Sequence, residues 1–434
     1  MTDYNYIGQA LPRYDGEGQV TGRTIFVDDV SKPGMLYVKV FRSPVHKGVV
    51  RNIDASETMK VPGVIGIVSA KDVPGVNVGW FGDVPVFAEN IRFQGQVIAG
   101  VVAVDEDTAA EGVARLKVDI EEQTPVFDMF EAIKPGAPLV DAGTPNNLFA
   151  GFNKGTTFKL VLGDVEQGFK EADYIVEGDY SEGTQDHASM EPHASVAYLD
   201  AADRLCIHTT SQCLAFQLRS LMAVFNRPLS KIRYIGGIVG GGFGGKNEIH
   251  TDHIAGVAAL KFRKPIKYRE TRREDLRYST KRGAWAFHFK DGVKKDGRLV
   301  ARYVEHWHDS GAYNTFSSYG IEKGSMFLSG PFWIPNILIE GHCVLTNKPV
   351  SSSMRGYTTA NGQFASEVQM TKIAQKLGMD QWEIRMLNAW RDGDLGASRY
   401  VVLGAGAIEA MKKTAELAGI KLPEHVMQMS SRRR

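Results

Sequence analysis

The sequence contains little cysteine, and what it has is scattered. Its 434 residues include three cysteines, Cys206, Cys213 and Cys343, with no Cys-x-x-Cys pair. This spacing argues against a disulfide framework, and against an iron–sulfur cluster or structural zinc held by this chain alone. Three free thiols fit a reducing cytoplasm, so we expect a cytoplasmic protein whose electron carriers, if it does redox chemistry, sit on other chains.

Charge, apolar runs and several catalytic signatures are also missing. A net charge of +1 gives no reason to expect nucleic acid or an anionic membrane as partner. No apolar stretch approaches a membrane span, and the N-terminus has no signal-peptide pattern. The chain has no Gly-x-Ser-x-Gly elbow, cysteine–histidine nucleophile pattern or His-Glu-x-x-His spacing. These absences leave no signature of a serine or cysteine hydrolase or of a zinc protease.

Glycine is concentrated at one place. Residues 240–246 read Gly-Gly-Gly-Phe-Gly-Gly-Lys and follow the apolar run 234–239. A bare backbone can approach a planar or anionic ligand and point successive N–H groups at it. We expect a helix over residues 247–263, whose N-terminus would add positive charge at the same spot. The segment predicts a phosphate or cofactor cradle, and a tight turn without a ligand is an equal alternative.

The spacing of this loop also matches a P-loop up to Lys246. The next residue is Asn247, where the pattern needs Ser or Thr to bind magnesium. A P-loop nucleotide-binding protein is therefore a disfavoured alternative.

The chain divides into two units. Residues 14–125 predict an α+β unit, and residues 126–160, rich in Pro, Gly and Asn, predict a linker. Residues 161–420 predict a second unit of mixed strands and helices. Residues 421–434 form a tail whose end we expect to fray.

Local patterns predict several elements within these units. In the first unit we expect strands at 35–41, 64–68, 97–104 and 118–120, and a helix whose capping box starts at Thr108. In the second we expect a helix over 214–225, a hairpin at Asp296-Gly297, a helix closed by Gly378 and another capped by Asp380.

The eleven histidines invite metal hypotheses. The pairs His250/His253 and His306/His308 would each share one face of an element, but packing is the better interpretation for both. A denser cluster is better read as a hydrogen-bonded turn, although it could line a site: Asp186, His187, Glu191 and His193.

A second loop, residues 351–363, precedes an expected helix. It contains Arg355-Gly356-Tyr357. This run combines a charge, a permissive backbone and a flat stacking surface. Alone it is a weak indication of a binding site.

These two loops, in this order and at this separation, resemble the molybdenum hydroxylases of the xanthine dehydrogenase and aldehyde oxidase family. Segments 183–187, 210–212 and 309–313 also fall in family order, and the likeness covers residues from about 15 to 394. The resemblance implies an α+β chain with an N-terminal a/b-hammerhead domain, followed by the first half of a molybdopterin-binding domain of mixed sheets and helices. It implies molybdopterin, expected as the cytosine dinucleotide. The pterin dithiolene would hold the molybdenum, with no metal ligand from the protein.

The resemblance also assigns cofactor-binding positions. Gln212 aligns with the glutamine that hydrogen-bonds the molybdenum oxo ligand. Gly242, Phe243 and Gly244 align with the loop beside the metal and its dithiolene. Arg355 aligns with an arginine whose backbone contacts the cofactor.

Three further positions concern the substrate. Tyr357 aligns with an aromatic residue, usually Phe, that stacks on flat substrates, and its hydroxyl needs a partner. Lys323 stands where purine-oxidising members carry a substrate-facing arginine, and an ordinary surface lysine is the alternative. Asn247 replaces a glutamate that would anchor a purine, which disfavours xanthine itself.

The implied activity is hydroxylation of an aromatic N-heterocycle, nicotinate- or purine-like, with oxygen from water. An aldehyde oxidoreductase subunit is the main alternative within the family, and a non-catalytic paralogue is another. The family's molybdenum-binding subunit is usually much longer than this chain. We therefore expect a second molybdopterin-binding subunit that carries the glutamate base, as in the nicotinate dehydrogenase branch, unless the chain is truncated. Electrons would pass to a 2Fe–2S subunit and an FAD subunit.

Overall fold

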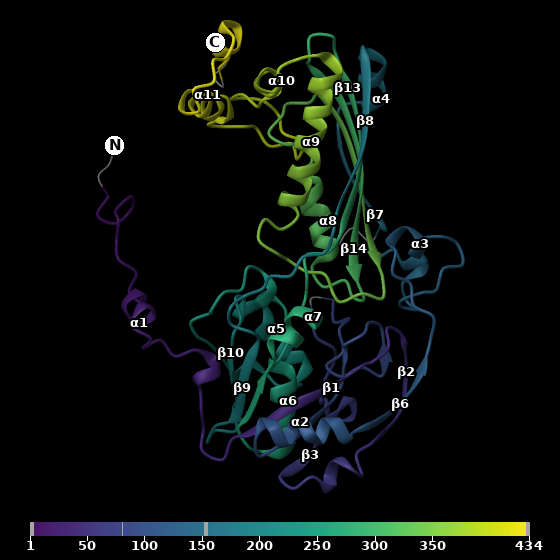
Figure 1. Cartoon of the computed structure of the whole chain (residues 1–434), viewed down its shortest axis with the longest axis vertical. Coiled ribbons are helices and arrows are strands. Elements are labelled where there is room, and N and C mark those ends of the chain that lie inside the picture. Colours follow the sequence, from purple (N-terminus) through teal and green to yellow (C-terminus); the bar gives the residue numbers. More distant parts are fainter. Residues whose placement is uncertain (1–3, 80, 152–154, 431–434) are drawn as a thin grey trace.

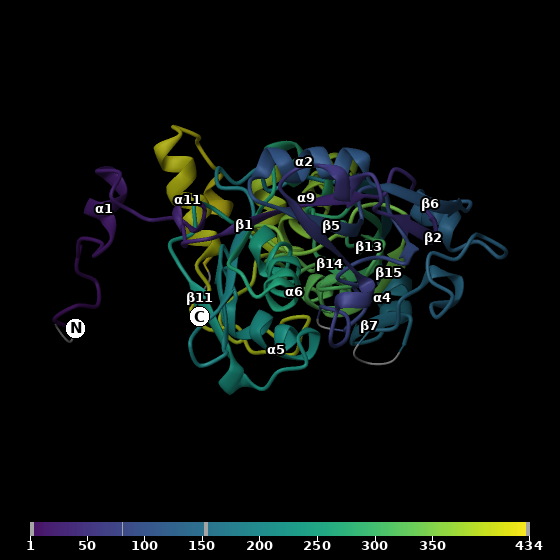
Figure 2. The same cartoon turned by 90° about the horizontal axis from the view of Figure 1, so that it is seen from below.

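The computed structural model describes residues 4–79, 81–151 and 155–430. They form two lobes, each built around a β-sheet, and Figure 1 shows the lobes one above the other. The N-terminal stretch, with the short helix α1 (Gly16–Val20), runs away from the body as an arm (Figure 2).

The lower lobe contains a seven-stranded sheet in the order β11-β10-β9-β12-β1-β5-β3. Its strands are β1 (Leu36–Arg42), β3 (Val64–Ser69), β5 (Val97–Ala103), β9 (Ala194–Leu199), β10 (Leu205–Thr209), β11 (Ile232–Gly236) and β12 (Ile266–Arg269). The helices packed around it are α2 (Glu106–Arg115), α5 (Leu214–Val224) and α6 (Asp252–Phe262).

This sheet combines both units expected from the sequence. β1 pairs in parallel with β12, with Leu36 opposite Ile266, and β5 pairs with β1 on its other side. Strands from the first 103 residues and strands from beyond residue 193 are thus hydrogen-bonded to one another. The two units share a sheet in addition to the segment that joins them.

Helices cover both faces of the sheet. Val102 of β5 packs in one core with Val257 of α6, whereas its neighbour Val101 packs in another core with Val113 of α2. Because successive strand residues point to opposite faces, α6 and α2 lie on opposite sides of the sheet, as Figure 2 shows.

The first unit also contains a small three-stranded sheet, in the order β4-β2-β6, made of β2 (Gly48–Asp54), β4 (Asn90–Ile91) and β6 (Lys117–Glu122). The expected linker, residues 126–160, has structure of its own. It contains the short helix α3 (Met129–Ala132), with Ala132 buried beside Val126 and Leu345.

The upper lobe is a five-stranded sheet in the order β7-β15-β14-β13-β8. Its strands are β7 (Thr157–Leu162), β8 (Tyr174–Glu182), β13 (Trp285–Val293), β14 (Leu299–Gly311) and β15 (Asn336–Leu345). The helices of this lobe and of the C-terminal region are α4 (Val165–Glu171), α8 (Ser317–Ser325), α9 (Thr359–Leu377), α10 (Gln381–Asn388), α11 (Ala407–Leu417) and α12 (Glu424–Met427).

Elements with strong local signals agree with expectation. The hairpin β13–β14 turns at Asp296-Gly297, and α5 matches the helix expected over 214–225. Gly378 ends α9 at a positive φ of 66°, and the Asp380 side chain accepts hydrogen bonds from the first N–H groups of α10. In the expected tail, Val426 is buried in a cluster with α10 and α11, and residues 431–434 lie outside the described part of the chain.

Two helix starts differ from expectation. α2 begins at Glu106, because Asp105 is its N-cap and accepts from the N–H of Thr108. The helix expected from residue 247 begins only at Asp252. The Gln217 amide donates to the carbonyls of residues 246, 247 and 248 at 3.2, 2.9 and 2.8 Å, and so occupies acceptors that a helix would use.

Among the described residues, no helix is long and apolar enough to cross a membrane.

Two histidines of β14 confirm the packing interpretation. The rings of His306 and His308 stack on Trp285 at 5.7 and 4.2 Å between centroids. Each ring also forms a hydrogen bond with a serine hydroxyl of α8. His306 Nε2 lies 2.8 Å from Ser325 Oγ, and His308 Nε2 lies 3.1 Å from Ser317 Oγ. Burial lowers the pKa of His306 to about 3 and that of His308 to about 4.

These buried histidines make the fold sensitive to acid. Below the ordinary pKa of 6.5 the unfolded chain takes up protons that the folded chain refuses until about pH 4. The free energy of unfolding should therefore decrease as the pH is lowered below 6.5, by about 1.4 kcal/mol per pH unit for each histidine. His306→Gln should reduce this slope between pH 6.5 and 5 in denaturant titrations, and His425→Gln, at an exposed site, should not. Equal slopes in the wild type and in His306→Gln would contradict the assignment.

Candidate functional site

The glycine loop, residues 240–246, follows β11 and is held by the Gln212 side chain. Gln212 Oε1 accepts hydrogen bonds from the N–H groups of Gly244 at 3.0 Å and Lys246 at 3.3 Å. Its own backbone N–H donates to the Lys246 carbonyl at 3.0 Å. A Cβ on Gly242 would lie 2.4 Å from the Gln212 amide, so this approach requires glycine. The Gln212 amide nitrogen makes no hydrogen bond within the described ranges and is free to donate.

The second loop meets the first along its backbone. Arg355 N–H donates to the Phe243 carbonyl at 2.8 Å. Ser353 Oγ accepts from the Asn247 amide at 2.8 Å and donates to the Gly244 carbonyl at 3.2 Å. The structure therefore brings together the positions that the sequence assigned to the cofactor: Gln212, Gly242, Phe243, Gly244 and Arg355.

Part of the glycine loop stays open for a ligand. The N–H groups of Gly241, Gly242 and Phe243 have no hydrogen-bond partner among the described residues. Phe243 is 44% exposed as a residue, and its backbone has a φ of 53°. Three free donors beside an exposed ring form a cradle for a flat or anionic group.

The prediction that a helix N-terminus adds positive charge at this cradle is wrong. α6 begins at Asp252, beyond the end of the loop. Donors elsewhere in the loop are also used internally: Gly240 N–H donates to Glu191 Oε2 at 2.7 Å, and Gly245 N–H to the Gly242 carbonyl at 2.8 Å.

Tyr357 and Lys323 lie together near this cradle. The Tyr357 hydroxyl donates to the Phe316 carbonyl at 2.6 Å, which gives it the partner that the sequence required. The Lys323 ammonium lies 5.6 Å from the centre of the Tyr357 ring. The hydrogen bond fixes the ring, and the lysine places a positive charge against it.

A pocket reaches the residue that follows the glycine loop and the residue that holds the Tyr357 hydroxyl. It has a volume of about 560 Å³ and is lined mainly by α5, by the segment after β3 and by the residues that follow the glycine loop. Asn247 and Phe316 both contribute to its wall. The pocket thus connects the end of the cradle with the residue whose carbonyl holds Tyr357.

A buried ion pair fastens the glycine loop from behind. Lys246 is 1% exposed, and its ammonium lies 2.6 Å from Glu191 Oε2, the same oxygen that accepts from Gly240. Burial lowers the pKa of Lys246, and Glu191 opposes that shift. In a P-loop the lysine reaches the phosphates, so a lysine committed to this pair does not fit the nucleotide-binding alternative.

Glu248 was missed at the sequence level, and His193 was named there only in a cluster read as a hydrogen-bonded turn that could line a site. Burial raises the pKa of Glu248 to about 7, and its carboxylate accepts from the Ser352 hydroxyl at 2.7 Å. His193 contacts Asp275 Oδ1 at 2.8 Å and the Gly245 carbonyl at 3.2 Å. Burial opposes charge on His193, but Asp275 and Glu270 raise its pKa. Only the crowding of Glu191 and His193 in the sequence hinted at this polar layer.

Comparison with known proteins decides the family. Residues 142–389 match the molybdopterin cofactor-binding domain, and residues 21–124 match the a/b-hammerhead domain of aldehyde oxidase and xanthine dehydrogenase. The chain belongs to the xanthine dehydrogenase and aldehyde oxidase family. It is a molybdopterin-binding member of this family of oxidoreductases, and the expected fold is confirmed.

Individual members differ in how much of their length this chain spans. It is 32% identical to the nicotinate dehydrogenase large molybdopterin subunit of Eubacterium barkeri, over 96% of this chain and 97% of that protein. It is 33% identical to a probable xanthine dehydrogenase component of Bacillus subtilis, over 88% of this chain but 51% of that protein. The aldehyde oxidoreductase structure from Desulfovibrio gigas superposes with a TM-score of 0.90 at 28% identity, and 46% of that chain is covered.

The close approach of the two loops can be tested at Gly244. Its φ is 103° and an added Cβ would lie 2.5 Å from the Ser353 carbonyl, so Gly244→Ala should lower the free energy of unfolding by about 1–3 kcal/mol and loosen the cradle. Gly237→Ala is the matched control, because a Cβ there meets nothing within 4 Å. Unfolding titrations of both variants measure the difference. Equal stability of the two would show that the loops do not meet as described.

Proposed function

We propose that this chain is the molybdopterin-binding subunit of a multi-subunit molybdenum hydroxylase that acts on an aromatic N-heterocycle, nicotinate- or purine-like. The observation that carries the proposal is the pair Tyr357 and Lys323. A fixed aromatic ring with an ammonium against it suits a flat substrate with negative charge, and a pocket of about 560 Å³ reaches Phe316, whose carbonyl holds that ring.

The residues of the cradle fit a molybdopterin. The N–H groups of Gly242 and Phe243 and the Gln212 amide nitrogen are donors without a partner in the described part of the chain. The Arg355 backbone borders them through its bond to Phe243. Bound molybdopterin, expected as the cytosine dinucleotide, supplies the redox centre at which a substrate carbon is hydroxylated with oxygen from water. This chain supplies position and oriented dipoles.

The substrate class follows from Asn247, in the pocket wall, and from Lys323, beside the Tyr357 ring. The Asn247 amide is committed to Ser353, and an amide gives a purine no carboxylate anchor. Lys323 can pair with a carboxylate on the substrate or with negative charge that develops on the ring. A nicotinate-like acid therefore fits better than xanthine.

Further subunits complete the proposed enzyme. Cys206 and Cys343 are buried and Cys213 is half-buried, and burial raises the pKa of Cys343 to about 12. These thiols are poorly placed to hold a cluster, so a 2Fe–2S subunit and an FAD subunit carry the electrons. A second molybdopterin-binding subunit supplies the glutamate base. The near-complete overlap with a protein named large molybdopterin subunit supports this division.

An aldehyde oxidoreductase is the second candidate. The superposition on the Desulfovibrio gigas enzyme favours it. An aldehyde needs no cation, so the contribution of Lys323 discriminates between the two.

Removing the Lys323 charge tests the substrate class. In the intact complex, Lys323→Met should raise KM for an anionic heterocycle such as nicotinate about tenfold or more, which corresponds to about 1.4 kcal/mol or more. KM for an uncharged heterocycle or an aldehyde should change little. Lys372→Met, which removes a lysine 4.6 Å from the Tyr180 ring, is the matched control. Equal effects on charged and uncharged substrates would overturn the role of Lys323.

The Gln212 donor can be separated from the Gln212 acceptor. Gln212→Glu keeps an oxygen for the N–H groups of Gly244 and Lys246 but removes the donor. We expect turnover to fall about tenfold or more while molybdenum is retained. Gln363→Glu, at an amide that donates to Phe327, is the control. Unchanged turnover in Gln212→Glu would show that the Gln212 donor does not act at the cofactor.

A further inference from the structure

A second cluster of polar groups lies behind the glycine loop. One nitrogen or oxygen atom from each of His193, His250 and Glu270 lies within 4.8 Å of the others. His193 precedes β9, His250 lies between the glycine loop and α6, and Glu270 follows β12. The rings of His193 and His250 are 4.1 Å apart, and His193 Nδ1 is 3.6 Å from Glu270 Oε2. Three segments distant in sequence thus bring imidazole and carboxylate groups to one place.

Two atoms of this cluster have no hydrogen-bond partner. Glu270 is 3% exposed, and its Oε2 is buried without a partner in the described part of the chain, whereas its Oε1 accepts from Arg42 at 2.8 Å. His250 Nε2 is also buried and unpartnered within that part. Leaving such groups unsatisfied costs about 1–3 kcal/mol each. Two in one cluster indicate a shared partner.

His193 is oriented as a metal ligand is. Its Nε2–H can donate to the Gly245 carbonyl at 3.2 Å, and its Nδ1 faces Asp275 Oδ1 at 2.8 Å and Glu270 Oε2 at 3.6 Å, where a proton or a metal ion must lie between nitrogen and oxygen. Histidines that bind metals usually donate their other N–H to a backbone carbonyl or carboxylate in this way.

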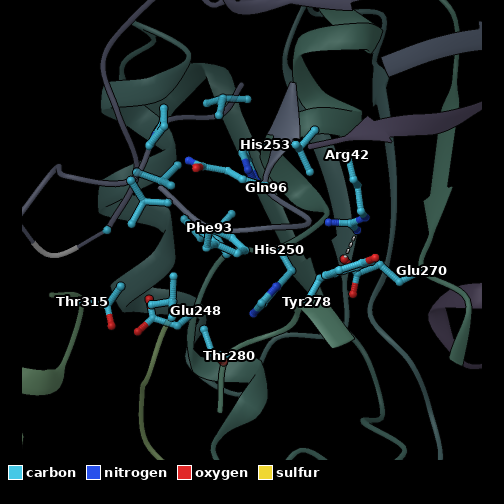
Figure 3. A pocket seen from close by; sticks show the side chains of 18 residues that line it. Arg42, Phe93, Gln96, Glu248, His250, His253, Glu270, Tyr278, Thr280 and Thr315 are labelled. Atoms are coloured by element: carbon cyan, nitrogen blue, oxygen red, sulfur yellow. Dashed lines mark hydrogen bonds and ion pairs between the residues drawn. The ribbon is translucent and has the colours of Figure 1, made fainter. Parts of the chain in front are cut away.

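The cluster opens onto a small pocket. The pocket has a volume of about 90 Å³ and is lined by His250, Glu270, Arg42 and Glu248 among others. Figure 3 shows Arg42 and Glu270 joined on one side of it, with His250 nearer the middle and Glu248 toward the other side. The pocket gives an ion a route to the unpartnered atoms.

We propose that His193, His250 and Glu270, with Asp275 as a neighbouring oxygen donor, bind a divalent metal of the zinc class. Two imidazole nitrogens and carboxylate oxygens are a donor set that zinc takes. The low cysteine count that argued against structural zinc does not bear on a site without sulfur ligands. The ion fixes His193 and, through it, the Gly245 carbonyl of the loop.

The competing arrangement is a proton in place of the metal. With both ring nitrogens protonated, His193 donates to Asp275 and to the Gly245 carbonyl. That state leaves His250 Nε2 without a partner and gives Glu270 Oε2 an ion pair with His193 at 3.6 Å but no hydrogen bond, whereas a metal satisfies both atoms. The number of atoms satisfied favours the metal.

Zinc analysis of the purified native complex tests the site. After incubation with zinc chloride and desalting, the wild type should retain one zinc ion per copy of this chain in elemental analysis. Zinc-edge X-ray absorption should show imidazole and oxygen ligands without sulfur. It is specific for zinc and is unaffected by iron or molybdenum in other sites.

Substitutions assign the ion to these residues. His250→Ala and Glu270→Gln should each lose this zinc, and His208→Asn, at a histidine of β10 outside the cluster, should retain it. Circular dichroism checks that the variants fold. The zinc-edge spectrum of the wild type tests the ligand set even if a variant does not fold. Zinc that is absent from the wild type, bound through sulfur, or retained in both ligand variants would overturn the proposal.

Discussion

The site depends on how closely two loops approach each other. The Gln212 side chain accepts from the N–H groups of Gly244 and Lys246, and the Ser353–Arg355 backbone contacts the same loop at Phe243 and Gly244. Side chains at Gly242 or Gly244 would collide with these neighbours at 2.4 and 2.5 Å. The glycines are therefore required by packing, and the free N–H groups at the centre of the loop result from that packing. The sequence left open whether the loop is a tightly packed turn or a cofactor cradle, and the structure combines the tight packing with free N–H donors.

Buried charge holds the loop from the other side. Lys246 and Glu191 form an ion pair that also binds Gly240, and His193 links the Gly245 carbonyl to Asp275 and Glu270. Removing one member of a buried pair costs several kcal/mol, because the other is left uncompensated. Both ends of the loop are thus attached to groups that cannot easily move. A cradle fixed in this way is already organised before a cofactor arrives.

The sequence predicted those helices and turns that depend on local pattern, and those site residues that depend on family resemblance. Helices α5 and α9 and the hairpin at Asp296-Gly297 have clear periodicity or turn residues, and they form where expected. The convergence of Gln212, Phe243 and Arg355 followed from the resemblance. The late start of α6 could not be predicted, because it depends on three carbonyls bound by the distant Gln217 side chain. The polar layer of His193, His250 and Glu270 is likewise tertiary, since strand pairing brings these residues together.

The most direct measurement is molybdenum and pterin analysis of the native assembly, purified through a tag on this chain. The account predicts molybdenum and pterin in equal amounts, close to one of each per copy of this chain, together with a second molybdopterin-binding subunit. An intact assembly that contains the partner subunit but neither molybdenum nor pterin would contradict the central claim.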